Sequence, residues 1–531
     1  MTVATAESLG VPEIFNAATH FVDRNIEEGR GRRIAIECGD ASITYDEVHQ
    51  KVNRFGSALL RLGVRPEERV LLLMYDGPEF VYAFFGAIKI GAVPVPLNTL
   101  WKPADYEYVI RDSRATMLVA SGALLPQIEA IPLATRRLLR HIIVVGSADA
   151  THTHTNYSVV MSYGADDLVA EPTHRDAPAF WLYSSGSTGA PKGCVHLQHD
   201  MVVCARLFGQ GVLGIRGSDR TFSVAKLFFA YGLGNALYFP FSVGATTILW
   251  PGAPTPQNVY SVIETHKPTL FYSVPTGYGM MLAQAGEFDL SSVRLAVSAG
   301  EALPQTLFDR FKQRFGVDII DGIGSTEALH MFISNRPGAI RPGSSGQIVP
   351  GYAARILDDD RAPVATGEIG NLWISGDSVC AAYWNQHEKT KNTIEGQWIR
   401  TGDKYSQDAD GYYWYAGRSD DMMKVGGLWV SPTEVESALV AHASVLECGV
   451  VGCEDRDTLT KPMAFVVLRD GVAASAELAK ELQQFVRERL AEYKRPRWVE
   501  FLPALPKTAT GKIQRFRLRE MATNDSSRRS V

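Results

Sequence analysis

Short apolar runs alternate with helix-like patterns over most of the chain. The run at 68–76 is typical of a buried strand, 78–90 of a largely buried helix, and 93–98 of the next strand. Three further apolar runs, each typical of a strand followed by small or polar residues, lie at 267–275, 293–301 and 317–327. Because β-rich runs that alternate with helical patterns are typical of α/β proteins, we predict an α/β architecture.

Helix-start signals support this interpretation. Thr44 and Glu47 have the spacing of a capping box, which predicts a helix that runs through Leu60. The segment 235–251 repeats the order of helix, Gly-Ala and strand found at 78–98. This repetition indicates two similar subdomains, although chance similarity would produce the same pattern.

The pattern changes after about residue 417. Ser431, Pro432 and Glu434 have the positions of an N-cap, a first helical residue and a capping box, so we expect a helix to start there. Apolar runs at 446–452 and 462–468 predict two strands. A later apolar stripe at helical spacing predicts core packing, through Leu478, Leu482, Phe485, Val486 and Leu490. The whole region predicts a small α+β domain of roughly 110 residues.

Composition narrows the classes of function. The chain has 531 residues, of which 46% are hydrophobic and 21% charged, and its formal net charge is −5. This is an ordinary globular composition with no general attraction for nucleic acid or anionic membranes. The six cysteines lack metal-binding spacing, so we expect reduced thiols in a cytoplasmic protein and no structural zinc. We find neither a signal-peptide pattern nor an uninterrupted apolar run that would span a membrane.

The most informative segment is YSSGSTGAPKG at 183–193. Its glycines let backbone N–H groups crowd around an anion, its hydroxyls add donors, and Lys192 adds a charge suited to phosphate. The apolar run 179–183 before it predicts a buried strand that fixes a loop at its end. The segment is not a Walker loop, because Lys192 is followed by Gly193 rather than by Ser or Thr. A solvated Gly/Ser linker is the alternative, and both the strand and the lysine argue against it.

Further segments follow in a fixed order. SAGEAL at 298–303 ends a strand with small residues that let a flat ring approach the backbone. DGIGSTE at 321–327 places a carboxylate beyond a glycine turn, and RTGD at 400–403 offers a carboxylate able to chelate a ribose diol. GRSDDMMKVGG at 417–427 and PKTATGK at 506–512 complete the series. Each of these segments, found alone, is more often an ordinary turn than a site.

In this order the segments resemble those of the adenylate-forming enzymes, which include acyl-CoA synthetases, nonribosomal-peptide adenylation domains and firefly-type luciferases. The resemblance covers about residues 15–520, and KLFFAYGLGNA, DGIGSTE and PKTATGKIQRF look like the benzoate–CoA and 4-hydroxybenzoate–CoA ligases. It implies a large domain, 1–419, of α/β subdomains with a β-barrel-like subdomain. It also implies a small mobile α+β domain, 420–531, that turns on a hinge at Asp420.

The resemblance implies that the enzyme uses ATP, Mg²⁺ and coenzyme A, with an aromatic carboxylate as the acid. A carboxylate oxygen attacks the α-phosphorus of ATP, which gives an acyl-adenylate and pyrophosphate. The coenzyme A thiol then attacks the acyl carbonyl and expels AMP. A site for this chemistry neutralises phosphate charge and holds the reacting atoms in line. No nucleic-acid or membrane partner is implied, and a homodimer is an assembly that the sequence does not decide.

The resemblance also assigns roles to individual residues that bind the nucleotide. It assigns the β- and γ-phosphates to Ser184, Ser185, Gly186, Ser187, Thr188, Gly189 and Lys192. It assigns adenine to Gly300, Glu301, Ala302, Asp321, Gly322 and Ile323. Thr326 and Glu327 are expected at the α-phosphate and Mg²⁺, with Glu327 as the metal ligand and both in a catalytic role. Asp403 and Arg418 are expected to hold the ribose.

The small domain is assigned two roles in turn. Lys512 is expected to catalyse adenylation by bridging the carboxylate and the α-phosphate oxygens. Rotation about Asp420 would then withdraw Lys512 and bring the segment of Lys424, Gly426 and Gly427 to the coenzyme A thiol. A static hairpin with ordinary glycines is the alternative to this rotation.

The KLFFAYGL segment is implied to line the acyl pocket. The residues assigned to this pocket are Val224, Ala225, Phe229, Ala230, Tyr231, Ala299, Gly324, His330 and Met331. Aromatic side chains against small ones suit a flat ring, and each of them would also fit plain core. The segment has no Asp to pair with an ammonium group, which disfavours amino-acid substrates. Met331 replaces a usual isoleucine and Val224 a smaller residue, and both changes alter the pocket volume.

Benzoate is the acid that we expect first. Hydroxylated, aminated or halogenated benzoates are the nearest alternatives, with His330 or Tyr231 as polar partners. A stand-alone enzyme that loads a carrier protein, a non-catalytic nucleotide-binding regulator and a luciferase-like oxygenase are the other classes. A regulator predicts erosion of Lys512, Glu327 or Asp403, and all three are present.

Overall fold

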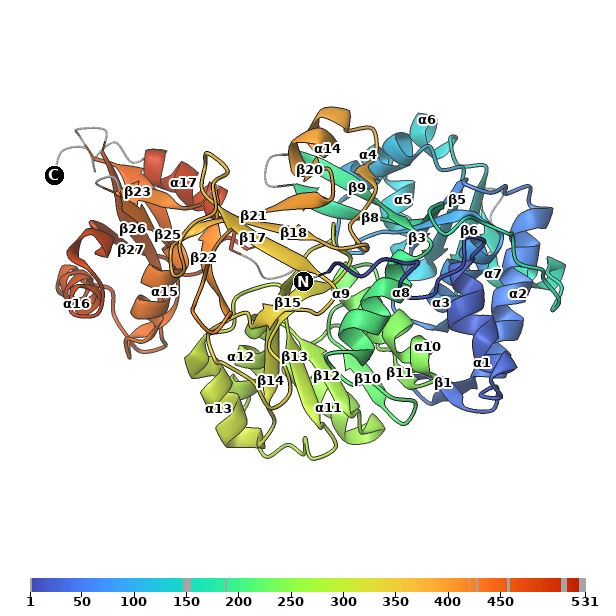
Figure 1. The fold of residues 1–531 in the computed structure, drawn as a ribbon, viewed down its shortest axis with the longest axis horizontal. Coiled ribbons are helices and arrows are strands. Elements are labelled where there is room, and N and C mark those ends of the chain that lie inside the picture. Colours follow the sequence, from blue (N-terminus) through green and yellow to red (C-terminus); the bar gives the residue numbers. More distant parts are fainter. Residues whose placement is uncertain are drawn as a thin grey trace. The chain divides into compact units, whose positions relative to one another are not determined.

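The computed structural model describes residues 2–146, 154–186, 189–419, 421–425, 428–455, 459–507 and 513–524. The chain divides into two compact units, Met1–Ala354 with Ile374–Ile399, and Arg355–Trp373 with Arg400–Val531. Both units combine helices and strands (Figure 1), which confirms the predicted α/β architecture. The boundary expected between residues 419 and 420 stays a prediction, because Asp420 lies outside the described residues.

The larger sheet of the first unit has nine strands. Their order is β16 (Gln347–Ile348), β15 (Met331–Ser334), β14 (Ile319–Gly324), β13 (Leu295–Ser298), β12 (Leu270–Ser273), β10 (Arg220–Ser223), β11 (Thr246–Ile248), β1 (Ile34–Cys38) and β2 (Ala41–Thr44). The strands from β14 to β1 are parallel, and β15, β16 and β2 add antiparallel edges. Side chains of α11 (Pro256–His266), α12 (Pro275–Ala283) and α13 (Gln305–Phe315) share one buried core with the strands.

The second sheet of this unit is parallel throughout. Its order is β4 (Val93–Pro96), β3 (Arg69–Leu73), β5 (Met117–Ser121), β6 (His141–Val145) and β7 (Thr155–Asn156). The expected buried strand, helix and strand are β3, α3 (Pro78–Lys89) and β4. The predicted capping box is also present, since the Glu47 N–H donates to Thr44 Oγ1 at 3.2 Å at the start of α2 (Tyr45–Arg61).

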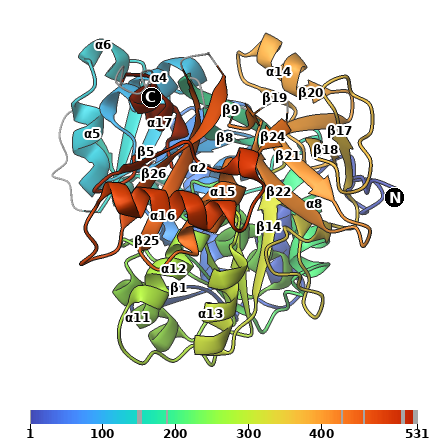
Figure 2. The same cartoon turned by 90° about the vertical axis from the view of Figure 1, so that its left-hand side faces the viewer.

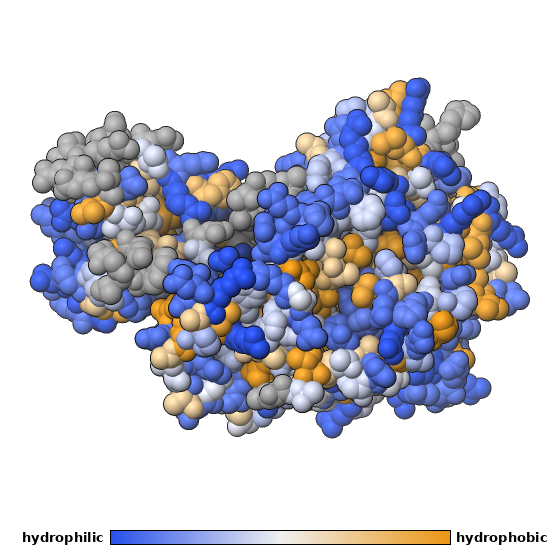
Figure 3. All heavy atoms as spheres, turned by 45° about the horizontal axis from the view of Figure 1, so that its top comes forward, coloured by the Kyte–Doolittle hydropathy of each residue, from blue (hydrophilic) through white to orange (hydrophobic). Residues whose placement is uncertain are grey.

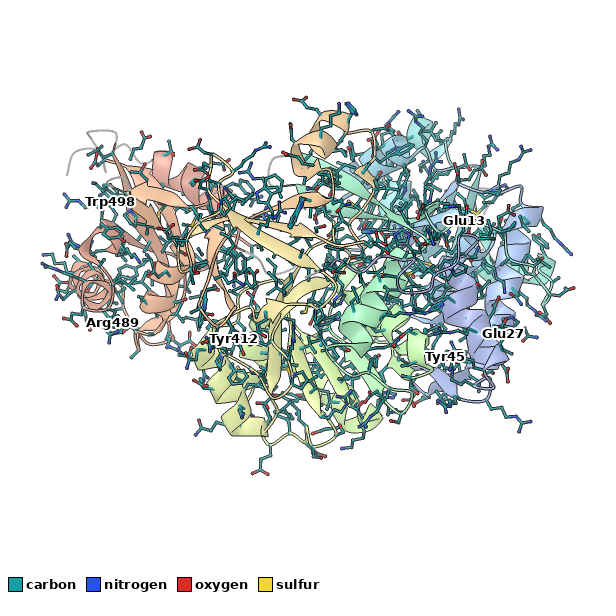
Figure 4. The ribbon with its side chains drawn as sticks, viewed as in Figure 1. Glu13, Glu27, Tyr45, Tyr412, Arg489 and Trp498 are labelled. Carbon is teal, nitrogen blue, oxygen red and sulfur yellow. The ribbon has the colours of Figure 1, made fainter. Side chains whose placement is uncertain are left out.

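The repeated order of helix, glycine and strand occurs once in each sheet. In the five-stranded sheet, α3 leads through Gly91 to β4; in the nine-stranded sheet, α10 (Phe239–Val243) leads through Gly244 to β11. Both glycines have positive φ, 74° and 69°, a conformation that glycine adopts without strain. Tyr45, labelled in Figure 4, is fully buried and its hydroxyl donates to Ala245 O at 2.6 Å. This bond ties the start of α2 to the second of the two turns.

A three-stranded antiparallel sheet holds the glycine-rich segment. It consists of β19 (Ala382–Tyr383), β9 (Gly189–Leu197) and β8 (Pro178–Gly186). The segment was expected to be a loop at a strand end, yet the strands continue into it, with Ser184 opposite Lys192 and Gly186 opposite Gly189. The pairing satisfies backbone N–H and C=O groups that a loop would have left open.

The second unit contains three further groups of strands. Most residues of β17 (Ala353–Leu357), β18 (Gly370–Ser375) and β21 (Trp398–Gln407) belong to it, and β22 (Tyr413–Arg418) pairs antiparallel with β21. The other sheet is β25 (Val445–Glu454), β26 (Thr460–Leu468) and β27 (Trp498–Phe501), while β23 (Met423–Val425) and β24 (Leu428–Val430) form a hairpin.

Helices cover both faces of the β25–β26–β27 sheet. Val450 and Val466 share a core with α15 (Pro432–Val440) and α16 (Ala476–Arg487), which Figure 2 shows beside each other. Val451 and Phe465 share a second core with α17 (Arg515–Asn524). Side chains of consecutive strand residues point to opposite faces, so the two cores lie on opposite sides of the sheet. The predicted α+β region is confirmed, including the N-cap of α15, where the Ser431 hydroxyl accepts from the Glu434 N–H at 3.2 Å.

Three further observations concern the surface, the helices and the thiols. The face drawn in Figure 3 is mostly hydrophilic, with scattered hydrophobic residues. Among the described residues, no helix has the length and the apolar character that crossing a bilayer would require. All six cysteines are free thiols, as expected from their spacing.

Candidate active site

The carboxyl ends of three parallel strands carry a row of polar side chains. Ser273 on β12 lies in register with Ser298 on β13, which lies in register with Asp321 on β14. Ser273 Oγ, Ser298 Oγ and Asp321 Oδ1 are buried, and within the described ranges none has a hydrogen-bond partner of standard geometry. Open parallel sheets bind their ligands outside the carboxyl ends of the strands. The row therefore marks an edge that a polar ligand or water would complete.

Asp321 gives this edge a testable dependence on pH. Burial raises its pKa to about 8. Because the folded-state pKa lies above the ordinary value of 3.8, the unfolded chain ionises first and the free energy of unfolding falls as pH rises toward 8. We expect Asp321→Asn to remove this loss, which amounts to at most about 1.4 kcal/mol per pH unit. Thermal unfolding of the ligand-free protein between pH 5 and 8 measures it, and a pH-independent difference in Tm from the wild type would contradict the assignment.

A charged pair lies at the base of the glycine-rich hairpin. Lys192 Nζ on β9 donates to Glu327 Oε1 at 2.9 Å and to the Tyr383 hydroxyl at 3.0 Å. The Tyr383 hydroxyl donates to the same Glu327 oxygen at 2.7 Å, and Lys192 Nζ lies 4.3 Å from the centre of the Tyr383 ring. The side chains of Lys192 and Glu327 are each 15% exposed. The three groups thus form one compact, nearly buried centre in the first unit.

The charge of this centre is set by its environment. Burial alone would raise the pKa of Glu327, yet the Lys192 charge and the Tyr383 hydroxyl lower it below its usual value. Burial and the nearby Glu327 carboxylate raise the pKa of Tyr383, so the phenol stays a donor. The ionised Glu327 carboxylate is suited to bind a metal cation, and the Lys192 ammonium group is suited to bind phosphate. The pair therefore fits a polyphosphate with its bound cation.

Backbone contacts hold the turn that carries Glu327. Thr326 O faces His196 Nε2 at 2.8 Å, and His196 Nδ1 faces Asp200 Oδ2 at 2.8 Å, with both side chains fully buried. The Cys380 N–H donates to Glu327 O at 2.7 Å. Strand β9 therefore carries both Lys192, which contacts Glu327, and the buried His196, which contacts Thr326 O.

The remaining phosphate residues lie on the same hairpin. Ser184 is on β8, opposite Lys192, and its Oγ lies 3.9 Å from Cys194 Sγ. Ser185, Gly186 and Gly189 are placed on the paired strands. Ser187 and Thr188 lie outside the described residues. The hairpin thus carries Lys192, which contacts Glu327, with Ser184 on the paired strand.

Of the two segments assigned to adenine, Gly300–Ala302 follows β13 and Asp321–Ile323 lies within β14. Gly300 is exposed with φ +89°, and Glu301 Oε2 accepts from Thr276 Oγ1 at 2.9 Å. Ala302 is exposed at the same loop. A Cβ at Gly322 would lie 2.5 Å from Ile333 O, so only glycine fits this close approach of β14 and β15.

Gly322 and Ile323 complete the strand end that begins with Asp321. Ile323 pairs with Ile333 across β14 and β15. These positions are adjacent to the polar row, and their assignment to adenine stays a prediction.

Part of the predicted acyl pocket forms an aromatic cluster. The ring centroids of Tyr231 and His330 lie 5.6 Å apart, and His330 Nε2 lies 3.1 Å from Asn235 Oδ1. The Tyr231 hydroxyl donates to Val297 O at 3.0 Å, which places the ring over the strand that leads to Ala299. Burial lowers the pKa of His330 to about 3, so its ring is neutral at physiological pH.

The other pocket residues flank this cluster. Gly324 pairs with Met331 across β14 and β15, and a Cβ at Gly324 would lie 2.5 Å from His330 O. The segment after β10 supplies the rest, with Val224, Ala225 and Phe229 half-buried and Ala230 buried at the start of α9 (Ala230–Leu233). Val224 packs against the core of the nine-stranded sheet.

The predicted ribose residues form a pair in the second unit. Arg418 on β22 lies in register with Asp403 on β21, and its Nη1 donates to Asp403 Oδ1 at 3.1 Å and to Thr401 O at 3.2 Å. Lys424 is placed on β23, and Asp420, Gly426, Gly427 and Lys512 lie outside the described residues. Their assigned roles stay predictions.

The sequence reasoning missed three residues at the charged centre. Tyr383 contacts both Lys192 and Glu327, and His196 with Asp200 supports Thr326. The i, i+4 spacing of His196 and Asp200, with the histidine four residues after Lys192, was the available signal. No comparable signal pointed to Tyr383, because it lies far along the chain from both of its partners.

Comparison with known protein families shows the family to which this chain belongs. Residues 22–384 match the family described as AMP-binding enzyme, and residues 434–512 match the AMP-binding enzyme C-terminal domain. The chain belongs to the AMP-binding enzyme family. Both regions of an AMP-binding enzyme are present, in the order that the motifs predicted.

Relatives of this AMP-binding enzyme include several aryl ligases. Benzoate–CoA ligase of Thauera aromatica is 50% identical over 97% of this chain and 98% of its own length. The 4-hydroxybenzoate–CoA/benzoate–CoA ligase of Rhodopseudomonas palustris is 46% identical over 96% of this chain and 94% of its own. The predicted resemblance to these two kinds of ligase is confirmed.

Solved structures that are similar to this chain also include aryl–CoA ligases. The anthranilate CoA ligase AuaEII in complex with anthranoyl-AMP matches with a TM-score of 0.92 and 47% identity, over 97% of this chain and 98% of that one. A benzoate CoA ligase from Burkholderia xenovorans LB400 matches with a TM-score of 0.87 and 45% identity, over 95% of this chain and 100% of that one.

Proposed function

We propose that this protein is an ATP-dependent benzoate–CoA ligase. It is an AMP-forming acid–thiol ligase of the aryl-CoA type, since benzoate and 4-hydroxybenzoate ligases align with nearly its whole length. The observation that carries the proposal is that one short segment, 327–330, links two different environments. Glu327 belongs to the charged centre with Lys192, and His330 belongs to the neutral aromatic cluster with Tyr231. This juxtaposition suits a polyphosphate beside a flat, uncharged ring.

In the first half-reaction the aryl carboxylate attacks the α-phosphorus of ATP and pyrophosphate leaves. Lys192 and the hairpin residues from Ser184 onward neutralise the β- and γ-phosphates, which lowers the cost of bringing two anions together. Thr326 orients the α-phosphate. The polar row at the ends of β13 and β14 holds adenine, and Asp403 with Arg418 holds the ribose.

Glu327 is the residue that would hold Mg²⁺. Its carboxylate is ionised and nearly buried, and Mg²⁺ commonly binds one or two carboxylates together with phosphates and water. Within the described part of the chain no group of three or more His, Cys, Asp or Glu side chains could hold a metal without ATP. When bound, the ion supplies positive charge against the phosphate oxygens.

Lys512 supplies the bridging charge of adenylation, and the segment of Lys424, Gly426 and Gly427 serves the second half-reaction after rotation at Asp420. The benzoyl-adenylate carbonyl is then attacked by the coenzyme A thiol, and AMP leaves. The motif order supports this assignment. One site thereby runs two reactions with different residues in place.

The pocket chemistry favours an unsubstituted ring. A neutral His330, Tyr231 and the small residues Ala299 and Gly324 suit benzoate. A hydroxylated or aminated benzoate, with the polar atoms of His330 or Tyr231 as partners, is the alternative acid. Loading of a carrier protein in place of coenzyme A is the alternative second step, and a homodimer is the assembly that light scattering would test.

Product formation from a panel of acids tests the proposal. With ATP, Mg²⁺ and free coenzyme A, we expect benzoate to give benzoyl-CoA, AMP and pyrophosphate with the highest kcat/KM of the panel. Substituted benzoates, cyclohexanecarboxylate and short fatty acids complete the panel. Adenylation without thioester formation would shift the function to carrier loading, and a higher kcat/KM for a substituted benzoate would replace the acid.

A further inference from the structure

Residues 224–229 include three of the nine residues assigned to the acyl pocket and make few backbone hydrogen bonds with one another. Residues 224–229 lie between β10 and α9 and form no regular element. The Val224 N–H donates to Tyr272 O at 2.9 Å, and the Phe229 N–H donates to Lys226 O at 3.0 Å. A Cβ at Gly232 would lie 2.1 Å from Lys226 O, so α9 presses closely on this segment. The position of this segment therefore depends on the contacts of its central residues, Lys226 and Leu227.

Asp76 fixes that centre from the other sheet. It follows β3 of the five-stranded sheet and is 4% exposed. Its Oδ1 accepts from the Leu227 N–H at 3.0 Å, and its Oδ2 lies 4.0 Å from Lys226 Nζ. Burial raises the pKa of Asp76 to about 6, although Lys226 and the Leu227 N–H lower it. Asp76 is therefore mainly ionised at neutral pH, where it attracts both partners.

Lys226 continues the connection to a third segment. Its Nζ donates to Trp250 O at 2.5 Å and to Gly252 O at 2.9 Å, just after β11. A nearly buried ammonium with two carbonyls and one carboxylate has few alternative positions, because each alternative would leave a buried charge unpaired. The same residue is the first of the KLFFAYGL segment.

We propose that Asp76 and Lys226 form a clamp that positions the acyl pocket. The clamp fixes Leu227, and thereby the neighbouring Ala225 and Phe229, at a set distance from Tyr231 and His330. Neither Asp76 nor Lys226 contacts the charged centre at Lys192 and Glu327 in the contacts described above. The clamp therefore acts on the acid and not on ATP. This inference rests on the proposed acyl pocket.

Asp76→Asn tests the clamp with little change in shape. The amide oxygen can still accept from the Leu227 N–H, but the attraction for Lys226 is lost and a second donor faces the ammonium. We expect the KM for benzoate to rise about tenfold, which corresponds to about 1.4 kcal/mol. The KM for ATP should stay within about twofold, and preference for benzoate over 4-substituted benzoates should weaken, because a displaced pocket wall discriminates less.

Asp219→Asn is the matched control. Asp219 is 2% exposed, and its Oδ2 accepts from Arg294 Nη2 at 2.8 Å. It lies just before β10, at the opposite end of the strand from residue 224. Both variants remove one charge from a buried ion pair, so both should lower Tm. Only Asp76→Asn should change the KM for benzoate.

A second variant, Lys226→Met, and hydrogen–deuterium exchange of backbone amides complete the test. Lys226→Met keeps the Asp76 bond to Leu227 and removes the ammonium, and we expect a smaller rise in the KM for benzoate. Deuterium exchange of residues 224–233 in the ligand-free protein should increase in Asp76→Asn and not in Asp219→Asn. Unchanged exchange, or KM values for benzoate and ATP that rise together, would overturn the clamp. Absence of ligase activity in the wild-type enzyme would overturn the proposed function. Deuterium exchange in Asp76→Asn and Asp219→Asn would still test whether Asp76 and Lys226 position residues 224–233.

Discussion

Lys512→Ala is expected to lower the rate of adenylation by about 100-fold or more. The expected cause is loss of a positive charge that bridges the attacking carboxylate and the α-phosphate, where both reacting groups are anionic. Conversion of synthetic benzoyl-adenylate to benzoyl-CoA should persist, because the proposed second half-reaction does not use Lys512. Exchange of labelled pyrophosphate into ATP measures the first step, and direct thioester formation measures the second.

Lys507→Ala provides the matched control for Lys512. Lys507 forms an antiparallel β-bridge with Ile513, and these two residues flank the segment that contains Lys512. The Lys507 Nζ donates to Glu447 Oε2 at 2.5 Å. Within the same unit, Arg515 binds both carboxylate oxygens of Glu436, at 2.8 and 2.6 Å, and thereby anchors the start of α17. Loss of the Lys507 side chain should leave both half-reactions within about twofold, since surface ion pairs contribute little. Pyrophosphate exchange that survives in Lys512→Ala would refute the role of Lys512.

Glu327→Gln is expected to have the second large effect. The substitution keeps the shape of the side chain but removes the only carboxylate that we place at Mg²⁺ and leaves Lys192 without its counter-charge. We expect adenylation to fall by about 100-fold and the Mg²⁺ concentration for half-maximal rate to rise. Initial rates of pyrophosphate release across a Mg²⁺ titration measure both quantities.

Tyr383→Phe separates the charge of Glu327 from the hydrogen bonds around it. The ring remains beside Lys192, and the hydroxyl that donates to Glu327 and accepts from Lys192 is lost. We expect a loss of adenylation of about fivefold, corresponding to about 1 kcal/mol, because Lys192 and Glu327 keep their direct hydrogen bond. Equal losses in Glu327→Gln and Tyr383→Phe would show that the site needs the network and not the carboxylate as a metal ligand.

The ionisation of Glu327 also sets an acid limit for the charged centre. Its folded-state pKa lies below the ordinary value of 4.5, so the stabilisation from its pairing with Lys192 is complete above that value. That contribution is lost as pH falls through the folded-state pKa. We therefore expect that titration of Glu327 does not change the rate of adenylation between pH 6 and 8.

Sequence patterns predicted those parts of the fold that depend on neighbouring residues. The capping box of Thr44 and Glu47 and the N-cap at Ser431 are made within one helical turn, so their spacing alone predicts them. The strands that carry Ser273, Ser298 and Asp321 were also predicted, because apolar runs followed by small or polar residues mark buried parallel strands.

Contacts between distant segments were beyond the reach of those patterns. Tyr383 joins Lys192 and Glu327 across 191 and 56 positions of sequence, and Asp76 meets Leu227 across 151. No local spacing records such a meeting, since it arises only when the sheets form. The extension of the glycine-rich segment into paired strands was missed for the same reason: a partner strand, rather than local composition, decided its structure.

Formation of the mixed anhydride without coenzyme A tests the central claim most directly. Purified protein is mixed with ATP, Mg²⁺ and benzoate, quenched, and analysed by mass spectrometry for benzoyl-adenylate. We expect about one equivalent of benzoyl-adenylate per active site, with pyrophosphate released in equal amount. Absence of the adenylate with benzoate and with every substituted benzoate would contradict the assignment of this chain as an aryl-CoA ligase.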